Sequence, residues 1–193
     1  MRNIIFAIVL LQLSTQLAAE NENTAQLEDQ ARNLAAQLGM QLKARLQNAM
    51  QTGGPASAIS TCNVSAPEIA DELSTDGWTV GRTSLKLRNP GNSPDEWEHS
   101  TLLAFEQQLA SGMPAAGLQN SVIETDDGVT RYRYMKAIPI DTVCMACHGE
   151  AISGDVKSVL AEKYPLDAAT GYKPGQLRGA FTVSKILTDN EAD

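Results

Sequence analysis

The five residues Cys144-Met145-Ala146-Cys147-His148, here called the CMACH motif, constrain this chain more than any other feature of its sequence. Two cysteines separated by two residues and followed directly by a histidine form the pattern by which a c-type haem is attached to protein. Each thiol can add to a vinyl group of the porphyrin, and the histidine is then placed under the iron as an axial ligand. The chain has three cysteines and two histidines, and the motif uses two of the former and one of the latter. The sequence therefore predicts one covalently attached haem c.

Three other uses of a Cys-x-x-Cys pair are the alternatives. A thioredoxin-like redox pair begins a helix after a strand in a βαβ unit, whereas Pro139 precedes this pair, Gly149 follows it and no βαβ pattern surrounds it. A structural zinc site takes four ligands with paired spacing, and the remaining candidates, Cys62 and His99, are isolated and far apart. A disulfide within the motif would close a very short, strained loop. Covalent haem fits the residues best.

The N-terminus resembles a secretory signal peptide. A short positive start, Met1-Arg2-Asn3, precedes an apolar run over residues 4–13, and Leu17-Ala18-Ala19 resembles a small-residue cleavage site. An uncleaved anchor is the alternative, although the apolar run is short for a membrane span. Haem attachment to such a motif takes place outside the bacterial cytoplasmic membrane, so export and the CMACH motif support each other. We expect a soluble periplasmic protein that is cleaved near Ala19.

The charge balance narrows the class of partners. Without residues 1–19 the chain has 14 basic and 23 acidic residues, a net charge of −9 before haem propionates are counted. An acidic protein of this kind is a poor partner for nucleic acid or anionic lipid. The sequence contains no Ser-His-Asp set, no phosphate-binding glycine loop after a strand and no paired carboxylates. We therefore expect a protein that is not an enzyme.

Hydrophobic periodicity predicts the order helices, strand, helix, hairpin, motif, helix, strand. Residues 24–50 carry an apolar stripe at every third or fourth position, which predicts one long amphipathic helix that ends at Gly53-Gly54-Pro55. Such a stripe packs on a core or forms the seam of a homodimer. Its members are Leu27, Ala31, Leu34, Leu38, Leu42, Leu46 and Ala49. The other predicted elements are helices 57–63, 66–73, 95–110 and 155–164, strands 78–87 and 177–187, and a hairpin over residues 121–138.

The order of these elements predicts the fold class. Most pairings between the strands would be antiparallel, which gives an α+β fold: an antiparallel sheet flanked by helices, with a long N-terminal helix. A small electron-carrier cytochrome is all-helical, so the pattern favours a sensor-like module. We divide the chain into a signal peptide (1–19), an N-terminal amphipathic helix (20–56) and a haem-binding domain (57–193).

Several segments, in this order along the chain, resemble a known family. They are residues 59–70, 77–90, the CMACH motif, 164–172 and Arg178-Gly179. Together they resemble the extracytoplasmic c-type haem domain with a PAS-like fold, which was long catalogued as a domain of unknown function. That domain occurs alone and as the sensory part of bacterial kinases and chemoreceptors. The resemblance covers residues 26–187, and it implies a PAS-like fold and a sensory role that needs a separate output partner.

The resemblance also implies an unusual pair of iron ligands. In the family the iron is held by the motif histidine and by a cysteine that precedes an Ala-Pro pair; in this chain these are His148 and Cys62. An odd cysteine in an exported protein is a liability unless it is buried, paired or bound to metal, and a buried free thiol is the alternative. The rival sixth ligands are His99, followed by Met40, Met50, Met113 and Met135.

Haem propionates need positive or hydrogen-bonding partners, and a guanidinium suits a carboxylate. The predicted strand over residues 131–134 alternates arginine with tyrosine, which places the arginines on one face and the tyrosines on the other. We predict Arg131 and Arg133 as propionate partners, with an exposed charged face as the alternative. Arg82 and Arg88 are the competing candidates. The tyrosines of the strand pack on the porphyrin or fill the core.

Three functions are compatible with these residues. We expect a periplasmic mono-haem protein that responds to redox state through a change at Cys62. A plain electron carrier, in which the ligands stay the same in both oxidation states, is the first alternative. A module that binds NO or CO, in which Cys62 is displaced, is the second.

Overall fold

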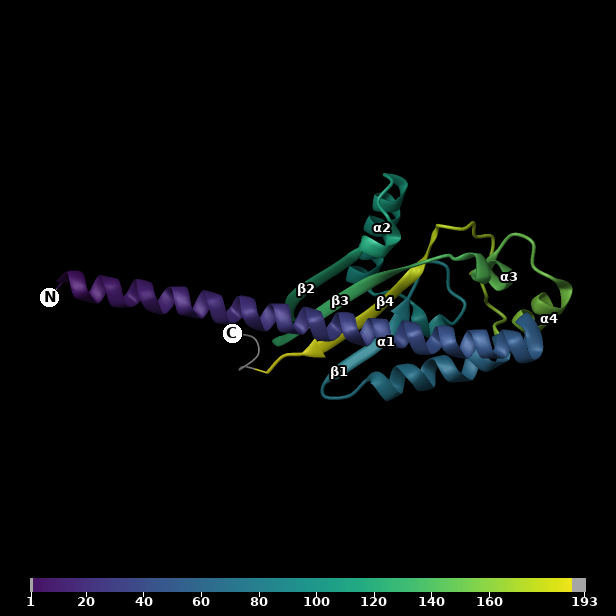
Figure 1. The fold of residues 1–193 in the computed structure, drawn as a ribbon, viewed down its shortest axis with the longest axis horizontal. Coiled ribbons are helices and arrows are strands. Elements are labelled where there is room, and N and C mark those ends of the chain that lie inside the picture. Colours follow the sequence, from purple (N-terminus) through teal and green to yellow (C-terminus); the bar gives the residue numbers. More distant parts are fainter. Residues whose placement is uncertain (1, 189–193) are drawn as a thin grey trace.

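The structure is a computed structural model that describes the backbone of residues 2–188 and the side chains of residues 23–188 (Figure 1). The helices are α1 (Arg2–Leu73), α2 (Glu96–Ala110), α3 (Met145–His148) and α4 (Gly154–Lys163), and the strands are β1 (Trp78–Thr83), β2 (Gln119–Asp126), β3 (Val129–Pro139) and β4 (Leu177–Ile186). Short 3-10 turns cover Pro90–Asn92, Ala115–Gly117 and Thr142–Cys144. The predicted signal peptide, residues 1–19, lies outside the residues whose side chains are described.

Helix α1 reverses its direction at Gly54, where the backbone leaves the helical region (φ 72°, ψ −174°). This combination of angles is accessible to glycine and to almost no other residue. Pro55 follows directly, and proline is well suited to the first turn of a new helical segment. Figure 1 shows the second segment, residues 55–73, returning alongside the first. The predicted end of the first helix at Gly53-Gly54-Pro55 is confirmed.

The second segment of α1 differs from the prediction of two short helices. It is a single helix that continues through Pro67. A proline inside a helix removes one backbone hydrogen bond and costs about 3 kcal/mol. Packing offsets this cost, because the neighbouring side chains Ala66 and Ile69 are buried and the segment contacts both β1 and α4. Tertiary contacts therefore keep the helix continuous where the local sequence favours an interruption.

The four strands form one antiparallel sheet in the order β1-β4-β3-β2. The predicted hairpin is confirmed as β2 and β3, which are joined by Asp127 and Gly128. Both residues have positive φ, as a two-residue type I′ turn requires, and Asp-Gly is a favoured pair there. Strand β1 is shorter than predicted. It ends at Thr83, because the N–H of Ser84 donates to the carbonyl of Asn92 and the chain turns away from the sheet.

The apolar stripe of α1 packs on one face of the sheet and α2 packs on the other. On the first face, Leu27, Ala31, Ala35 and Leu38 of α1 cover Trp78, Val80, Tyr132, Tyr134 and Val183. On the second face, Leu102 and Phe105 of α2 cover Met135, Ala137 and Ala180. The predicted α+β fold, with an antiparallel sheet flanked by helices and a long N-terminal helix, is confirmed.

The position of α1 bears on two further expectations. Most of its apolar stripe, including Leu27, Ala31 and Leu38, packs on the chain's own sheet. Dimerisation through this helix stays a prediction. The proposed domain boundary between residues 56 and 57 also stays a prediction. It lies within α1, shortly after the reversal at Gly54.

Gly179 allows the ends of β1 and β4 to approach each other closely. A Cβ atom at this position would lie 2.3 Å from the carbonyl oxygen of Thr83 and 2.8 Å from the Cβ of Ser84. Two backbones reach this separation only where one residue has no side chain. Arg82 and Arg178 flank the contact in sequence, so the close approach also fixes where their side chains begin.

We predict that Gly179→Ala lowers the free energy of unfolding by about 2 kcal/mol or more, because the added methyl group forces the two strand ends apart. Gly117→Ala is the matched control, since a Cβ there would meet nothing within 4 Å. The control should change stability by no more than about 0.5 kcal/mol. Chemical denaturation measures both variants. Equal stabilities would show that the strand ends separate without cost.

Candidate cofactor site

A cavity of about 400 Å³ lies on the face of the sheet that α1 covers. Both segments of α1, the ends of β1, β3 and β4, and the CMACH motif contribute to its wall. The apolar part of the wall includes Leu42, Leu46, Ala58, Ile59, Ile138 and Phe181. Gly39 permits this arrangement, because a Cβ there would lie 3.0 Å from the ring of Phe181. The cavity is therefore a product of the reversal in α1 and of the strand ends together.

The cavity brings together all the cysteines of the chain. Cys62 on the second segment of α1, and Cys144, Cys147 and His148 of the CMACH motif, line it together. The three thiols are free of disulfides and half-buried. Burial raises the pKa of the Cys62 and Cys147 thiols, and the nearby positive charge of Arg88 opposes that rise. Within the described chain, no group of three or more His, Cys, Asp or Glu side chains could hold a bare metal ion.

His148 is held in one orientation and one tautomer. Its Nδ1 lies 2.6 Å from the carbonyl oxygen of Ala169, which can only accept, so Nδ1 carries the proton. The lone pair is therefore on Nε2, which lies 3.4 Å from Nη1 of Arg88. Burial and the cations Arg88, Arg178 and Arg82 lower the pKa of His148 to about 3. The imidazole is neutral at ordinary pH, which is the form that binds a metal.

Three arginines reach the cavity from different parts of the chain: Arg82 from β1, Arg88 from the loop that follows it and Arg178 from β4. Lys43 of α1 adds a fourth cation, against the single carboxylate of Asp141 in the cavity wall. Arg82 and Arg88 were predicted as competing candidates. Arg178 was not predicted as a site residue, although the pair Arg178-Gly179 is among the residues that carry the family resemblance. An excess of positive charge of this kind suits an anionic group.

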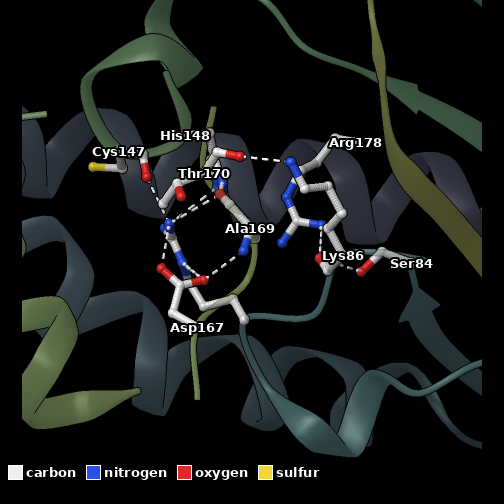
Figure 2. A network of polar contacts seen from close by, with 9 residues as sticks. Ser84, Lys86, Cys147, His148, Asp167, Ala169, Thr170 and Arg178 are labelled. Carbon is white, nitrogen blue, oxygen red and sulfur yellow. Dashed lines mark hydrogen bonds and ion pairs between the residues drawn. The ribbon is translucent and has the colours of Figure 1, made fainter. Parts of the chain in front are cut away.

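Arg88 forms a buried ion pair with Asp167. Its Nε donates to Oδ1 over 3.2 Å and its Nη2 lies 3.1 Å from Oδ2, which is the two-point geometry of a guanidinium and a carboxylate. The two side chains are 12% and 8% exposed, so the pair is screened little by solvent. Arg88 Nη2 also donates to the carbonyl of Cys147 over 2.5 Å. Figure 2 shows Asp167, Ala169, Cys147 and His148 gathered around this network.

Arg131 and Arg133, the predicted propionate partners, do not lie in the wall of the cavity. Arg133 pairs with Asp95 and Glu124 and stacks over the ring of Trp97, 4.5 Å from its centroid. Arg131 lies opposite Ile186 toward the other end of the sheet. The alternation along β3 explains this placement. It turns the arginines toward the face of α2, whereas the cavity is on the face of α1.

The neighbouring tyrosines follow the same alternation. Tyr132 and Tyr134 are buried under the first segment of α1 and fill the core, which is one of the two alternatives predicted for them. Tyr172, which sequence analysis did not single out, lies next to the site. Its ring meets that of His148 edge to face, with centroids 6.2 Å apart. The amino group of Lys86 lies over the Tyr172 ring, 4.7 Å from its centroid.

The residues predicted as rivals of Cys62 for the iron differ in whether they reach the cavity. His99 is exposed on α2, outside the wall of the cavity. Met40 and Met113 are exposed, and Met135 is buried in the cluster under α2. Met50 is the one of these rivals that lines the cavity, close to the reversal of α1. Cys62 and Met50 therefore share the cavity with His148.

Comparisons with known proteins identify the family of this chain and a solved structure of similar fold. The family model described as Tll0287-like matches residues 15–185, and the chain belongs to this family. The crystal structure of the cyanobacterial heme-protein Tll0287 is similar in fold, with a TM-score of 0.62 and 21% sequence identity. The match covers 86% of this chain and 96% of Tll0287. A comparison with curated proteins found no match.

The ion pair between Arg88 and Asp167 has a testable energetic signature. We predict that Arg88→Met lowers the free energy of unfolding by about 3 kcal/mol, because it leaves the Asp167 carboxylate buried without its partner. The double variant Arg88→Met/Asp167→Asn should lose less than the sum of the two single variants. Denaturation of the wild type and the three variants gives this double-mutant cycle. Additive losses would show that the two groups do not stabilise each other.

Proposed function

We propose that this protein is a periplasmic protein that carries one covalently attached haem c and responds to its redox state. The observation that carries the proposal is the cavity itself. It joins Cys144, Cys147 and His148 of the CMACH motif to Cys62, a residue from a distant helix, and surrounds them with apolar side chains and cations. Membership of the Tll0287-like family supports haem binding, since a heme-protein gives the family its name.

The residues of the cavity fit such a group. A volume of about 400 Å³ is within the range of cofactor sites, and the apolar wall suits the porphyrin plane. Both motif thiols and the unprotonated Nε2 of His148 belong to the same cavity. The positive charges of Arg82, Arg178 and Lys43 would meet the two propionates.

Each residue of the site then has a distinct role. Cys144 and Cys147 would form the two thioether links, and His148 would be one ligand of the iron. Cys62 would be the other, and Met50 lines the same cavity. When bound, haem c supplies an iron that cycles between the ferric and ferrous states. A thiolate stabilises the ferric state, so Cys62 would keep the reduction potential low compared with a His/Met site.

The position of Cys62 supports a sensory role over that of a rigid electron carrier. Cys62 lies on the second segment of α1, which is separated from the first by the glycine reversal at Gly54. Ile59, one turn earlier, packs against Val156 and Leu160 of α4. A change in the bond made by Cys62 would therefore act on a helix that contacts both α4 and β1. We propose that this segment transmits the redox state to a partner protein.

Export and the absence of catalysis belong to the same proposal. Residues 1–19 would act as the signal peptide, which gives the CMACH motif access to haem attachment outside the cytoplasm. Within the part of the chain that the structure describes, no helix is both long and apolar enough to cross a membrane. We propose a binding and sensing protein that is not an enzyme, with a protein partner as its output.

Covalent attachment is tested by the two motif cysteines. The protein, expressed with its N-terminal segment and with haem-attachment machinery, should retain haem after denaturation and acid-acetone extraction. The double variant Cys144→Ser/Cys147→Ser should lose it, because no thioether bond can form. Cys62→Ser is the matched control and should keep the covalent haem. A wild-type protein without a Soret band would overturn the haem proposal.

The sixth ligand is tested by absorption spectra and by the midpoint potential. Cys62→Ser should lose the ferric thiolate spectrum, and its midpoint potential should rise by 59 mV or more, about a tenfold loss of preference for the ferric state. Met50→Leu, which changes the other sulfur in the cavity, should leave the ferric spectrum unchanged. The proposal fails if Cys62→Ser keeps the wild-type spectrum and potential. A wild-type spectrum with the same ligands in both states would identify an electron carrier instead.

A further inference from the structure

The carbonyl group that orients His148 lies in a segment without regular secondary structure. Residues 165–171 run between α4 and β4 outside any helix or strand. Ala169 is fully buried in this segment, and its carbonyl oxygen is the acceptor for Nδ1 of His148. No helical or sheet ladder fixes the position of this oxygen. Its position depends on the hydrogen bonds that the segment makes with its neighbours.

Asp167 supplies one of these bonds from within the segment. Its Oδ1 accepts from the backbone N–H of Ala169 over 2.9 Å, so the carboxylate closes a short turn around the residue that contacts His148. The same carboxylate is held in place by Arg88 through the ion pair described above. A chain of contacts thus runs from Arg88 through Asp167 and Ala169 to the imidazole of His148.

Arg88 joins this segment to the CMACH motif. Besides the ion pair, its Nη2 donates to the carbonyl of Cys147 over 2.5 Å and reaches that of Ala169 at 3.4 Å. Backbone bonds on both sides strengthen the junction, since the N–H of Ala168 donates to the carbonyl of Leu87 and that of Tyr172 to the carbonyl of His148. One guanidinium group therefore connects three segments that are far apart in the sequence.

We propose that Arg88 and Asp167 are positioning residues for His148: their ion pair sets the place of the Ala169 carbonyl, and through it the orientation and donor strength of the imidazole. This inference rests on the proposed function, because it treats His148 as an iron ligand. Neither residue was expected to have this role. The sequence makes Arg88 a candidate partner for a propionate, and the structure instead gives its guanidinium a carboxylate and two backbone carbonyls within the protein.

The physical consequence is a change in the electron-donating strength of the histidine. A carbonyl acceptor on Nδ1–H makes the imidazole more basic, and a more basic ligand stabilises the ferric state. If the carbonyl moves away, the ferric state is less stabilised and the midpoint potential rises. Mutation of a group that hydrogen-bonds to a metal-ligating histidine commonly lowers metal affinity by a factor of about 10 or more.

The test compares Asp167→Asn with the double variant Arg88→Met/Asp167→Asn in the haem-loaded protein. Both variants disrupt the ion pair, so positioning predicts that both midpoint potentials rise by the same amount. The expected loss of preference for the ferric state is about tenfold, which corresponds to about 59 mV. The double variant is also the one expected to fold well, since it leaves neither charge unpaired.

A simple effect of charge makes a different prediction for the same two proteins. Removal of the carboxylate alone would raise the midpoint potential. If the guanidinium is removed as well, the two opposite charge effects cancel and the potential returns to the wild-type value. A double variant with the wild-type midpoint potential therefore overturns the proposal. If the double variant does not fold, Arg88→Lys replaces it, because lysine keeps the charge and loses the two-point geometry. A midpoint potential of Arg88→Lys equal to that of the wild type would likewise overturn the proposal.

Arg133→Met is the matched structural control. Arg133 is as little exposed as Arg88, at 12%, and makes ion pairs with Asp95 and Glu124 on the opposite face of the sheet. Its loss should lower stability and leave the midpoint potential unchanged. A wild-type protein without haem would refute the proposed function before this comparison begins. A haem-loaded wild type with unshifted variants would refute the positioning role alone.

Discussion

The packing of α1 on the sheet, together with its reversal at Gly54, is the constraint on which the candidate site depends. The first segment buries its apolar stripe against β1, β3 and β4, and the reversal then brings the second segment back over the strand ends. Both segments contribute to the wall of the cavity, and Cys62 reaches the CMACH motif only because the chain turns at that point. Each fully buried Leu in such a stripe contributes about 1.5–3 kcal/mol, so this packing stabilises the helix that forms one wall of the site.

The alternation of side chains along the strands decides which residues share the cavity. Arg82, Ile138 and Phe181 point to the face covered by α1, whereas Arg133 points to the face of α2 and is neutralised there by acidic side chains. A shift of one residue in register would exchange the two sets. Strand register therefore places Arg82 on the side of His148, and Arg88 reaches it from the loop after β1. Burial and these cations, together with Arg178, keep the imidazole neutral.

The site also shows how an irregular segment can carry a defined role. The loop between α4 and β4 has no ladder of its own, and yet Ala169 within it is fully buried. A buried backbone carbonyl must find a donor, and here the donor is His148. The ion pair of Arg88 and Asp167 replaces the missing secondary structure by tying the loop to the motif. Order in this part of the protein comes from this ion pair and from single backbone hydrogen bonds, such as those of Ala168 and Tyr172, and not from a helix or a strand.

Local patterns were enough to predict most of the helices and strands and to single out the CMACH motif of the candidate site. The stripe of α1, the Asp-Gly turn between β2 and β3, and the CMACH motif each depend on residues close together in the chain, where periodicity and turn chemistry act directly. Long-range packing decided the rest. It kept the second segment of α1 helical through Pro67, and it placed Arg82, Arg88 and Arg178, instead of Arg131 and Arg133, beside His148. The resemblance to a known family pointed to Cys62. Only the folded chain brings Cys62 into one cavity with the motif, because the wall of that cavity combines α1, the ends of three strands and the motif, which are far apart in the sequence.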